Sequence, residues 1–112
     1  MLPHSATAIV TRNDTWEKHG ATEPHEAGWA REAIFFVRAL EAKGPLASAR
    51  ASVQISPDGI HWADEGTKLA LPRRAGQMTF AKLRHFGGYL RLVARLPKGA
   101  ACRVVVALAL KE

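Results

Sequence analysis

Short segments in which apolar and polar residues alternate occur along most of the chain. In residues 50–55 every second residue is apolar, and Pro57-Asp58-Gly59 follows shortly after this segment. Alternation with a period of two is typical of a β-strand with one buried face. Proline fixes φ, aspartate bonds to nearby backbone and glycine accepts a positive φ, so this sequence predicts a tight turn that closes a hairpin.

The turn predicts structural roles for its residues. Ser56, Asp58 and Gly59 shape the turn, and Trp62 belongs to the same structural motif. Ile60 and Trp62 resume the alternation, which predicts that both face the core. A calcium site at Asp58 is not expected, because calcium takes about six to eight oxygen ligands and the turn offers one carboxylate.

Residues 89–96 and 102–110 show the most regular alternation in the chain. The residues predicted to face the core are Leu90, Leu92, Ala94, Leu96, Cys102, Val104, Val106, Leu108 and Leu110. The opposite side of residues 102–110 carries Val105, Ala107 and Ala109 in its middle, so it is apolar as well. A strand that is apolar on both faces is either covered on both or packs against a neighbour.

Residues 29–43 fit two secondary structures. A helical stripe of apolar residues favours a helix, which Thr22 could cap, Pro24 could open and Gly44 could end. Residues 34–37 form a β-branched and aromatic run that is apolar on both faces, which favours a core strand of a sheet. We favour the strand and keep the helix as the alternative.

The remaining alternating segments are short. We expect strands at residues 6–12, 15–19, 60–63, 68–71 and 77–83, a break at Asn13-Asp14 and a loop over residues 20–28. Together the segments predict an all-β fold, a single antiparallel β-sandwich or jelly roll of seven or eight short strands. Residues 1–112 would form one domain, with N-terminal strands and a loop in residues 1–28 and the core sandwich in residues 29–112.

Composition agrees with one folded domain. The chain has 112 residues, of which 47% are hydrophobic, enough for a core and unlike a disordered chain. Cys102 is the single cysteine, which excludes an intrachain disulfide and fits a reducing compartment. We find neither a signal-peptide pattern nor an apolar run of the ~20 residues that a membrane helix needs. We therefore expect a cytoplasmic protein without a membrane partner, or a virion protein if the chain derives from a phage.

Charge is divided unevenly along the chain. The net charge is +6, yet residues 1–65 carry nine acidic and six basic side chains, whereas residues 66–112 carry ten basic side chains and one acidic. This division indicates either an acidic partner such as nucleic acid or head-to-tail contact between identical subunits. Charges that only cover solvated faces would give the same pattern.

No group of residues predicts catalysis, a cofactor or a metal site. The five histidines lack the spacing of a metal motif, with no Cys-x-x-Cys or His-Glu-x-x-His sequence beside them. Cys102 belongs to the core-facing set, so we expect a buried and unreactive thiol. Gly87-Gly88 lacks the lysine and the following helix of a phosphate-binding loop and predicts a turn or bulge. We expect a protein that is not an enzyme.

Two sequence patterns together resemble known β-sandwich proteins. Ser-x-Asp-Gly-x-x-Trp at residues 56–62 and Tyr-hydrophobic-Arg at residues 89–91 precede a glycine turn and an apolar final strand. This order is similar to that of small, jelly-roll-like structural proteins of tailed phages and prophages, which implies self-assembly or docking onto a capsid or tail. A weaker similarity is to discoidin-type galactose-binding-like domains, which implies ligand binding through loops at one end.

The leading hypothesis is a non-enzymatic assembly protein that forms a homo-oligomer or docks onto a larger particle. The apolar outer sides of residues 34–40 and 102–110 and the divided charge support it. The candidate interface residues are Tyr89, Arg91, Val93, Arg95, Arg103, Val105, Ala107 and Ala109.

Two alternatives belong to other functional classes. A carbohydrate-binding module would use Trp16, Trp29 or Trp62, if any of them is exposed. A nucleic-acid-binding protein would use the basic second half, where Arg91 and Arg95 share an outward strand face with the single tyrosine. Proteins of that class stack bases on aromatic rings while they neutralise phosphates.

Overall fold

The computed structural model describes residues 4–112, and within this range the chain forms nine β-strands and no helix. The strands are β1 (Ser5–Glu17), β2 (His19–Ala21), β3 (His25–Glu26), β4 (Glu32–Lys43), β5 (Arg50–Ser56), β6 (Ala63–Ala70), β7 (Met78–Arg84), β8 (Tyr89–Arg95) and β9 (Ala101–Lys111). All paired strands are antiparallel. The predicted all-β antiparallel sandwich is confirmed.

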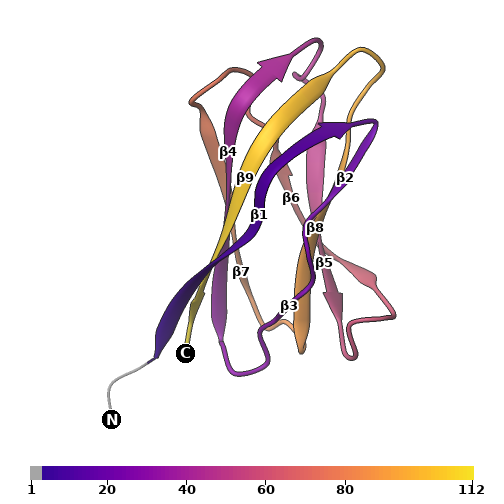
Figure 1. Ribbon diagram of the computed structural model, residues 1–112. Coiled ribbons are helices and arrows are strands. Elements are labelled where there is room, and N and C mark those ends of the chain that lie inside the picture. The colour runs from indigo at the N-terminus through magenta and orange to yellow at the C-terminus, as the bar shows by residue number, and fades with distance from the viewer. Residues whose placement is uncertain (1–3) are drawn as a thin grey trace.

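The strands form one hydrogen-bonded path that folds over itself into two packed layers (Figure 1). The order along the path is β6-β5-β8-β2-β1-β9-β4-β7, and β3 pairs with β8. One layer contains β6, β5 and β8 with the short β2 and β3, and the other contains β1, β9, β4 and β7. The layers join at one corner, where Glu17 pairs with His19. On the far side β6 and β7 lie next to each other, and within residues 4–112 no ladder connects them.

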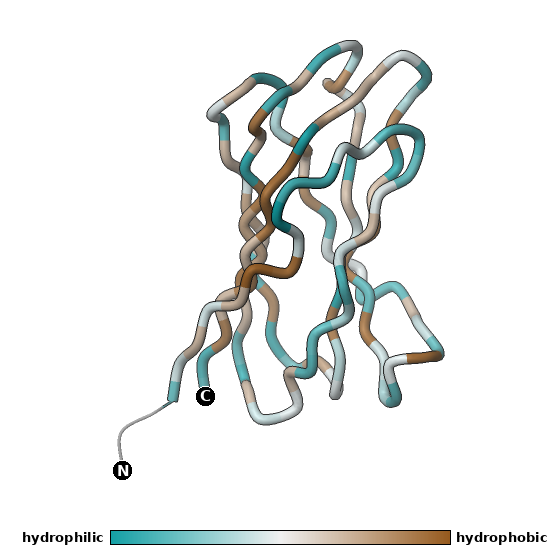
Figure 2. Tube along the Cα trace, viewed as in Figure 1, coloured by the Kyte–Doolittle hydropathy of each residue, from teal (hydrophilic) through white to brown (hydrophobic). Residues whose placement is uncertain are grey.

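The core lies between the layers and is filled by alternate side chains of the strands. Leu90 and Leu92 from β8, and Val104, Val106 and Leu108 from β9, all have 0% exposure. Every residue that the alternation of the last two strands assigned to the core is buried. Figure 2 shows hydrophobic colouring along the middle of β9 and hydrophilic colouring at many of the connections. Alternation predicted these faces because successive side chains of a strand point to opposite sides.

β4 decides between the two interpretations of residues 29–43 in favour of the strand. It pairs with β9 along nearly all of its length and with β7 on its other edge. Phe35 and Val37 point into the core with 0% exposure, whereas Ile34 and Phe36 are half-buried on the outer face. β-Branched and aromatic residues fit a pleated surface with apolar contacts on both faces, so pairing on two edges outweighs the helical stripe.

The N-terminal region differs from the prediction. Asn13 and Asp14 do not end a strand, because β1 continues past them through register shifts against β9. A bulge absorbs extra residues without ending a ladder. Within the expected loop of residues 20–28, β2 and β3 pair with β8, and the Leu92 amide donates to the Thr22 hydroxyl at 3.0 Å. These two short strands bring the count to nine rather than seven or eight.

The return strand of the hairpin begins later than predicted. β6 starts at Ala63, and residues 57–62 form the connection from β5. Ile60 is 75% exposed, so the prediction that it faces the core is wrong. The Asp58 carboxylate accepts hydrogen bonds from the amides of Ile60 and His61, which keeps both residues in the turn and out of the ladder.

The corner between the layers depends on close packing of Gly20 against Trp16. The Trp16 side chain is 2% exposed and belongs to the core. A Cβ atom built on Gly20 would collide with the indole ring. Since the ring is enclosed, it cannot move aside without disturbing its neighbours. Glycine is therefore required at position 20 for space.

We expect Gly20→Ala to lower the free energy of unfolding by about 1–3 kcal/mol, the usual cost of overpacking a core. Urea denaturation followed by tryptophan fluorescence measures this change. Gly88→Ala is the control, because a Cβ there lies 3.6 Å or more from the nearest backbone atoms of the β5–β6 turn. The control should change stability by about 0.5 kcal/mol or less. Equal losses in the two variants would contradict the role given to Gly20.

Candidate functional site

The outer face of the β1-β9-β4-β7 layer is apolar at its centre. Its apolar members, which we call the apolar face, are Ile9, Ile34, Phe36, Met78, Phe80, Val105, Ala107 and Ala109. Ile9, Met78 and Phe80 are 46%, 53% and 56% exposed. Among residues 4–112, the other large hydrophobic residue that is exposed is Ile60 in the β5–β6 turn.

The register of the strands joins these side chains into a continuous stripe. Ile9, Ala107, Phe36 and Phe80 are successive cross-strand partners on four neighbouring strands. Directly paired residues point to the same side of a sheet. The ring centroids of Phe36 and Phe80 are 6.2 Å apart. A continuous apolar stripe on a surface is typical of a contact with another molecule, whereas single exposed residues are not.

Basic side chains border the apolar face. Arg38 pairs in register with Val105 and Met78, and Lys82 pairs with Ile34. Within the described part of the chain, neither Arg38 nor Lys82 belongs to an ion pair. Positive charge without an acidic partner therefore lies beside the apolar stripe.

Arg103, a predicted interface residue, is held by its own sheet. Its Nη2 atom lies 3.2 Å from Oε1 of Glu41, and its Nη1 donates to Oδ1 of Asn13 at 2.8 Å. The side chain is about one-third exposed (32%). It is therefore less available to a partner than Arg38 or Lys82.

The predicted interface residues lie on two separate faces. Arg103, Val105, Ala107 and Ala109 lie on the outer side of β9, whereas Tyr89, Arg91, Val93 and Arg95 lie on the outer side of β8, in the other layer. The eight predicted interface residues therefore do not form one surface, and Arg91 and Arg95 lie away from Val105 and its neighbours. Alternation gives the face of each residue on its own strand, but the layer in which a strand lies depends on long-range pairing.

The outer side of β6, β5, β8 and β2 is the polar face. Arg91 Nε donates to Gln54 Oε1 at 2.8 Å, and Gln54 Nε2 donates to Asp64 Oδ1 at 3.0 Å. The Arg91 guanidinium also lies 4.2 Å from the centre of the Trp62 ring. Trp62 is half-buried here, so the prediction that it faces the core is wrong.

A hollow in two parts lies on the polar face. One part, of about 400 Å³, lies over β5, β6 and β8, and the other, of about 480 Å³, lies over β8 and β2. The residues common to both parts are Gln54, Val93 and Arg95. Two of the predicted interface residues, Val93 and Arg95, therefore line a concave surface.

The three tryptophans do not form a common ligand platform. Trp16 is 2% exposed, so it is not available to bind a ligand. Trp29 packs partly against the core, and the His4 ring lies 4.8 Å from it in an edge-on arrangement. Trp62 lies beneath Arg91. Each ring is already occupied by contacts within the protein.

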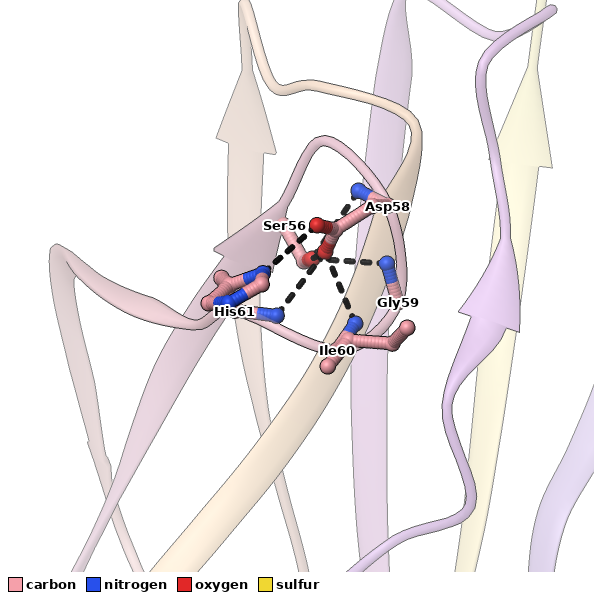
Figure 3. Close-up of polar contacts among 5 residues, drawn as sticks. All are labelled: Ser56, Asp58, Gly59, Ile60 and His61. Carbon is pink, nitrogen blue, oxygen red and sulfur yellow. Dashed lines mark hydrogen bonds and ion pairs between the residues drawn. The ribbon is translucent and has the colours of Figure 1, made fainter.

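Hydrogen bonds from backbone amides to the side chains of Ser56 and Asp58 hold the β5–β6 turn (Figure 3). Ser56 Oγ accepts from the Gly59 amide at 2.7 Å, and Asp58 Oδ1 accepts from the Ile60 and His61 amides, both at 2.8 Å. His61 Nδ1 lies 2.7 Å from Asp58 Oδ2. Gly59 has a φ of 80°, which disfavours a side chain there. The polar side chains of the turn thus stabilise the backbone of the turn itself.

These hydrogen bonds hold the pKa of Asp58 well below its ordinary value. The largest cause is the His61 amide, followed by the His61 side chain and the Ile60 amide. Each of them favours the charged carboxylate. Because the folded-state pKa is lower than the unfolded-state value, the stabilisation is present above about pH 4 and is lost as the pH falls through the folded-state pKa.

Asp58→Asn removes the charge and keeps an acceptor oxygen. Between about pH 5 and pH 2, the melting temperature of the unmodified protein should fall more steeply than that of the variant, because only the former loses a hydrogen-bonded carboxylate. Thermal unfolding followed by circular dichroism measures both curves. Asp14→Asn, at an exposed position of β1, makes the same charge change and should keep the steep fall. Parallel curves for all three proteins would rule out the role given to Asp58.

The described residues do not assemble a metal-binding centre, and the single cysteine is buried. Within residues 4–112, no three His, Cys, Asp or Glu side chains come together as metal ligands would. Cys102 is 1% exposed, with its Sγ 3.9 Å from the Pro72 carbonyl oxygen. Burial raises the pKa of its thiol, which disfavours the reactive thiolate.

Cys102 should react with Ellman's reagent only when the sandwich opens. We expect no release of thionitrobenzoate from the native protein and full release after addition of guanidinium chloride, because burial both covers the sulfur and disfavours the thiolate. Absorbance at a fixed reagent concentration follows the reaction. Rapid release under native conditions would contradict the assignment of Cys102 to a stable core.

The fold is similar to those of two solved structures of phage or prophage proteins. The PBSX exported protein XepA superposes with a TM-score of 0.64 at 12% identity, over 94% of this chain and 36% of XepA. The SPBc2 prophage-derived protein YomS superposes with a TM-score of 0.62 at 9% identity, over 100% of this chain and 96% of YomS. The predicted resemblance to phage and prophage β-proteins is confirmed, and it concerns the fold.

Two further comparisons found no similar protein. No family model matches the sequence, and a search of curated proteins found no match. The chain spans about one-third of XepA and nearly all of YomS. Residues 4–112 contain no helical segment with the length and hydropathy of a membrane span.

Met78 and Phe80 lie on the surface, which the pattern of residues 77–83 alone does not predict. The structure buries Ala81 and Leu83 of β7 instead, at 8% and 5% exposure. The available signal was the presence of apolar residues on both sides of residues 77–83. Which side faces the core is decided by the pairing of β7 with β4, and that pairing is long-range.

Proposed function

We propose that this protein is a non-enzymatic assembly protein that uses its apolar face to contact another protein surface. The stripe formed by Ile9, Ala107, Phe36 and Phe80 carries the proposal. Removing apolar surface from water is favourable by roughly 25 cal/mol per Å². The phage and prophage origin of XepA and YomS supports a role in building a particle.

The charges beside the apolar face favour a head-to-tail contact between copies. In a face-to-face dimer the same patch meets itself, so Arg38 and Lys82 of one copy would approach the same residues of the other. Like charges brought together across an interface oppose association. A surface that combines an apolar residue with an acidic group complements the apolar face better than a second apolar face does.

The β5–β6 turn combines these two features. Ile60 is 75% exposed, and the neighbouring Asp58 carries a carboxylate that favours the charged form. Because hydrogen bonds already fix the turn, docking Ile60 requires little further ordering. We therefore propose that the turn of one copy packs against Phe80 of the next copy, with Asp58 near Arg38 or Lys82.

The positions of the two surfaces allow each copy to bind two neighbours. The β5–β6 turn lies at one end of the molecule and in the other layer from β9 and β4 (Figure 1). Ile60 is the one strongly hydrophobic residue of this turn, whose residues are 57–62. A contact between two different surfaces of identical subunits generates rings or extended arrays. Either arrangement would suit a protein that covers part of a particle.

Two charge-introducing variants test the contact. Phe80→Asp and Ile60→Asp should each be monomeric where the unmodified protein is oligomeric, because each puts an uncompensated charge into the contact. Mixed in equal amounts, they should form a heterodimer and nothing larger, since each variant keeps one half of the contact. Size-exclusion chromatography with light scattering measures the masses. Ala75→Asp, in an exposed connection, is the control and should assemble normally.

Each result has a distinct meaning. A monomeric unmodified protein at high micromolar concentration would contradict self-assembly. Loss of the oligomer in Phe80→Asp but not in Ile60→Asp would contradict the head-to-tail contact and favour a face-to-face contact. Normal assembly of both variants would show that the apolar face is not part of the interface.

A further inference from the structure

A row of basic residues crosses the polar face at the end away from the β5–β6 turn. Arg50 of β5 is directly opposite Arg95 of β8, and Arg95 is opposite His19 of β2. One rung along, Lys68 of β6 is opposite Ser52. Directly opposite residues have Cβ atoms about 4.5–5.5 Å apart, so like charges in these positions destabilise a sheet. A bound anion would reduce this repulsion.

The described chain supplies little negative charge to this row. None of the ion pairs among residues 4–112 includes Arg50, Lys68 or Arg95. Asp64 lines the same part of the hollow, and its Oδ1 atom already accepts a hydrogen bond from Gln54. The hollow therefore contains three basic side chains and one carboxylate, and that carboxylate is already hydrogen-bonded to Gln54.

The hollow has the space and the donors for an anion. The part that contains Arg50, Lys68 and Arg95 measures about 400 Å³, within the usual range of ligand pockets. Its lining also contains Ser48, Ser52 and Gln54, whose polar groups can donate hydrogen bonds.

Arg50 is already held in place for such a role. Its Nη1 atom donates to the carbonyl oxygens of Ala47 and Ala49 at 3.0 and 2.9 Å. A guanidinium has five N–H donors, so further donors remain for a ligand. A group that is fixed before binding loses less conformational entropy when the ligand arrives.

We propose that this hollow binds a phosphate group, with Arg50 and Arg95 as its main ligands and Lys68 as a third cation. A phosphate monoester carries about −1.5 to −2 charge at neutral pH, which matches several cations better than a single carboxylate does. Guanidinium groups match phosphate oxygens in geometry as well as in charge. The site is separate from both halves of the assembly contact. It lies in the other layer from the apolar face, and Arg50 and Arg95 lie at the end of β5 and β8 away from the β5–β6 turn.

The arrangement favours one phosphate group over a nucleic-acid strand. Single-strand binders follow the backbone along a basic groove and stack successive bases on aromatic rings. Here Arg50 and Arg95 gather at one end of β8, whereas Tyr89 is at its other end. The nearby Trp62 ring is covered by Arg91 at 4.2 Å. The cations and the aromatic rings therefore do not interleave.

Isothermal titration calorimetry with inorganic phosphate and with pyrophosphate, at constant ionic strength, tests the proposal. The unmodified protein should bind both at one site per chain, and Arg95→Gln should weaken binding about tenfold or more, because it removes charge-assisted hydrogen bonds. Arg84→Gln is the matched control. It removes the same charge from an exposed arginine that pairs with Glu32 at 3.4 Å in the other layer, and it should bind like the unmodified protein.

Three results would overturn the proposal. The first is equal weakening in Arg95→Gln and Arg84→Gln, since net charge rather than the hollow would then attract the anion. The second is no binding of either probe by the unmodified protein. The third is binding of a single-stranded oligonucleotide under conditions where neither probe binds. Thermal unfolding without anion checks the fold, and Arg95→Gln should melt no lower than the unmodified protein because it removes a like-charge pair.

Discussion

The structure depends on β9, whose two edges and inner face are all covered by the protein itself. It pairs with β1 on one edge and with β4 on the other, so its backbone hydrogen bonds are satisfied within the sheet. Its inner side chains Val104, Val106 and Leu108 fill the core with 0% exposure. The middle of its outer side, formed by Val105, Ala107 and Ala109, is also apolar, yet no strand of the described chain covers it. This imbalance produces the apolar face.

Period-two alternation predicted more of the fold than local turn signals did. The core side of β8 and β9 followed from alternation, because each residue's face is fixed by its position along the strand. Asn13 and Asp14 are strong strand breakers by local preference, but the pairing of β1 with β9 outweighs that preference and leaves a register shift. Alternation extended through the turn predicts a core position for Ile60, but hydrogen bonds keep this residue out of the ladder.

The candidate surfaces could be predicted only in part, for a related reason. Val105, Ala107 and Ala109 were accessible to sequence analysis because one strand showed two apolar sides. Sequence could not predict that these residues lie apart from Arg91 and Arg95, because that separation depends on the layer to which each strand belongs. The opposition of Arg50 and Arg95 depends on the register between β5 and β8, which neither strand reveals alone. The two faces consequently offer different chemistry, one suited to apolar contact and the other to charged groups.

The pairing of β1 with β9 also determines when the sheet can be completed during protein synthesis. β1 is translated first among the nine strands and β9 last, yet they pair from Ser5 with Lys111 to Glu17 with Ala101. Until β9 emerges from the ribosome, β1 and β4 have no strand between them, and the stripe that crosses all three does not exist. Pairings this distant in sequence form late in folding. A nascent chain therefore completes the apolar stripe only after its last strand has been made.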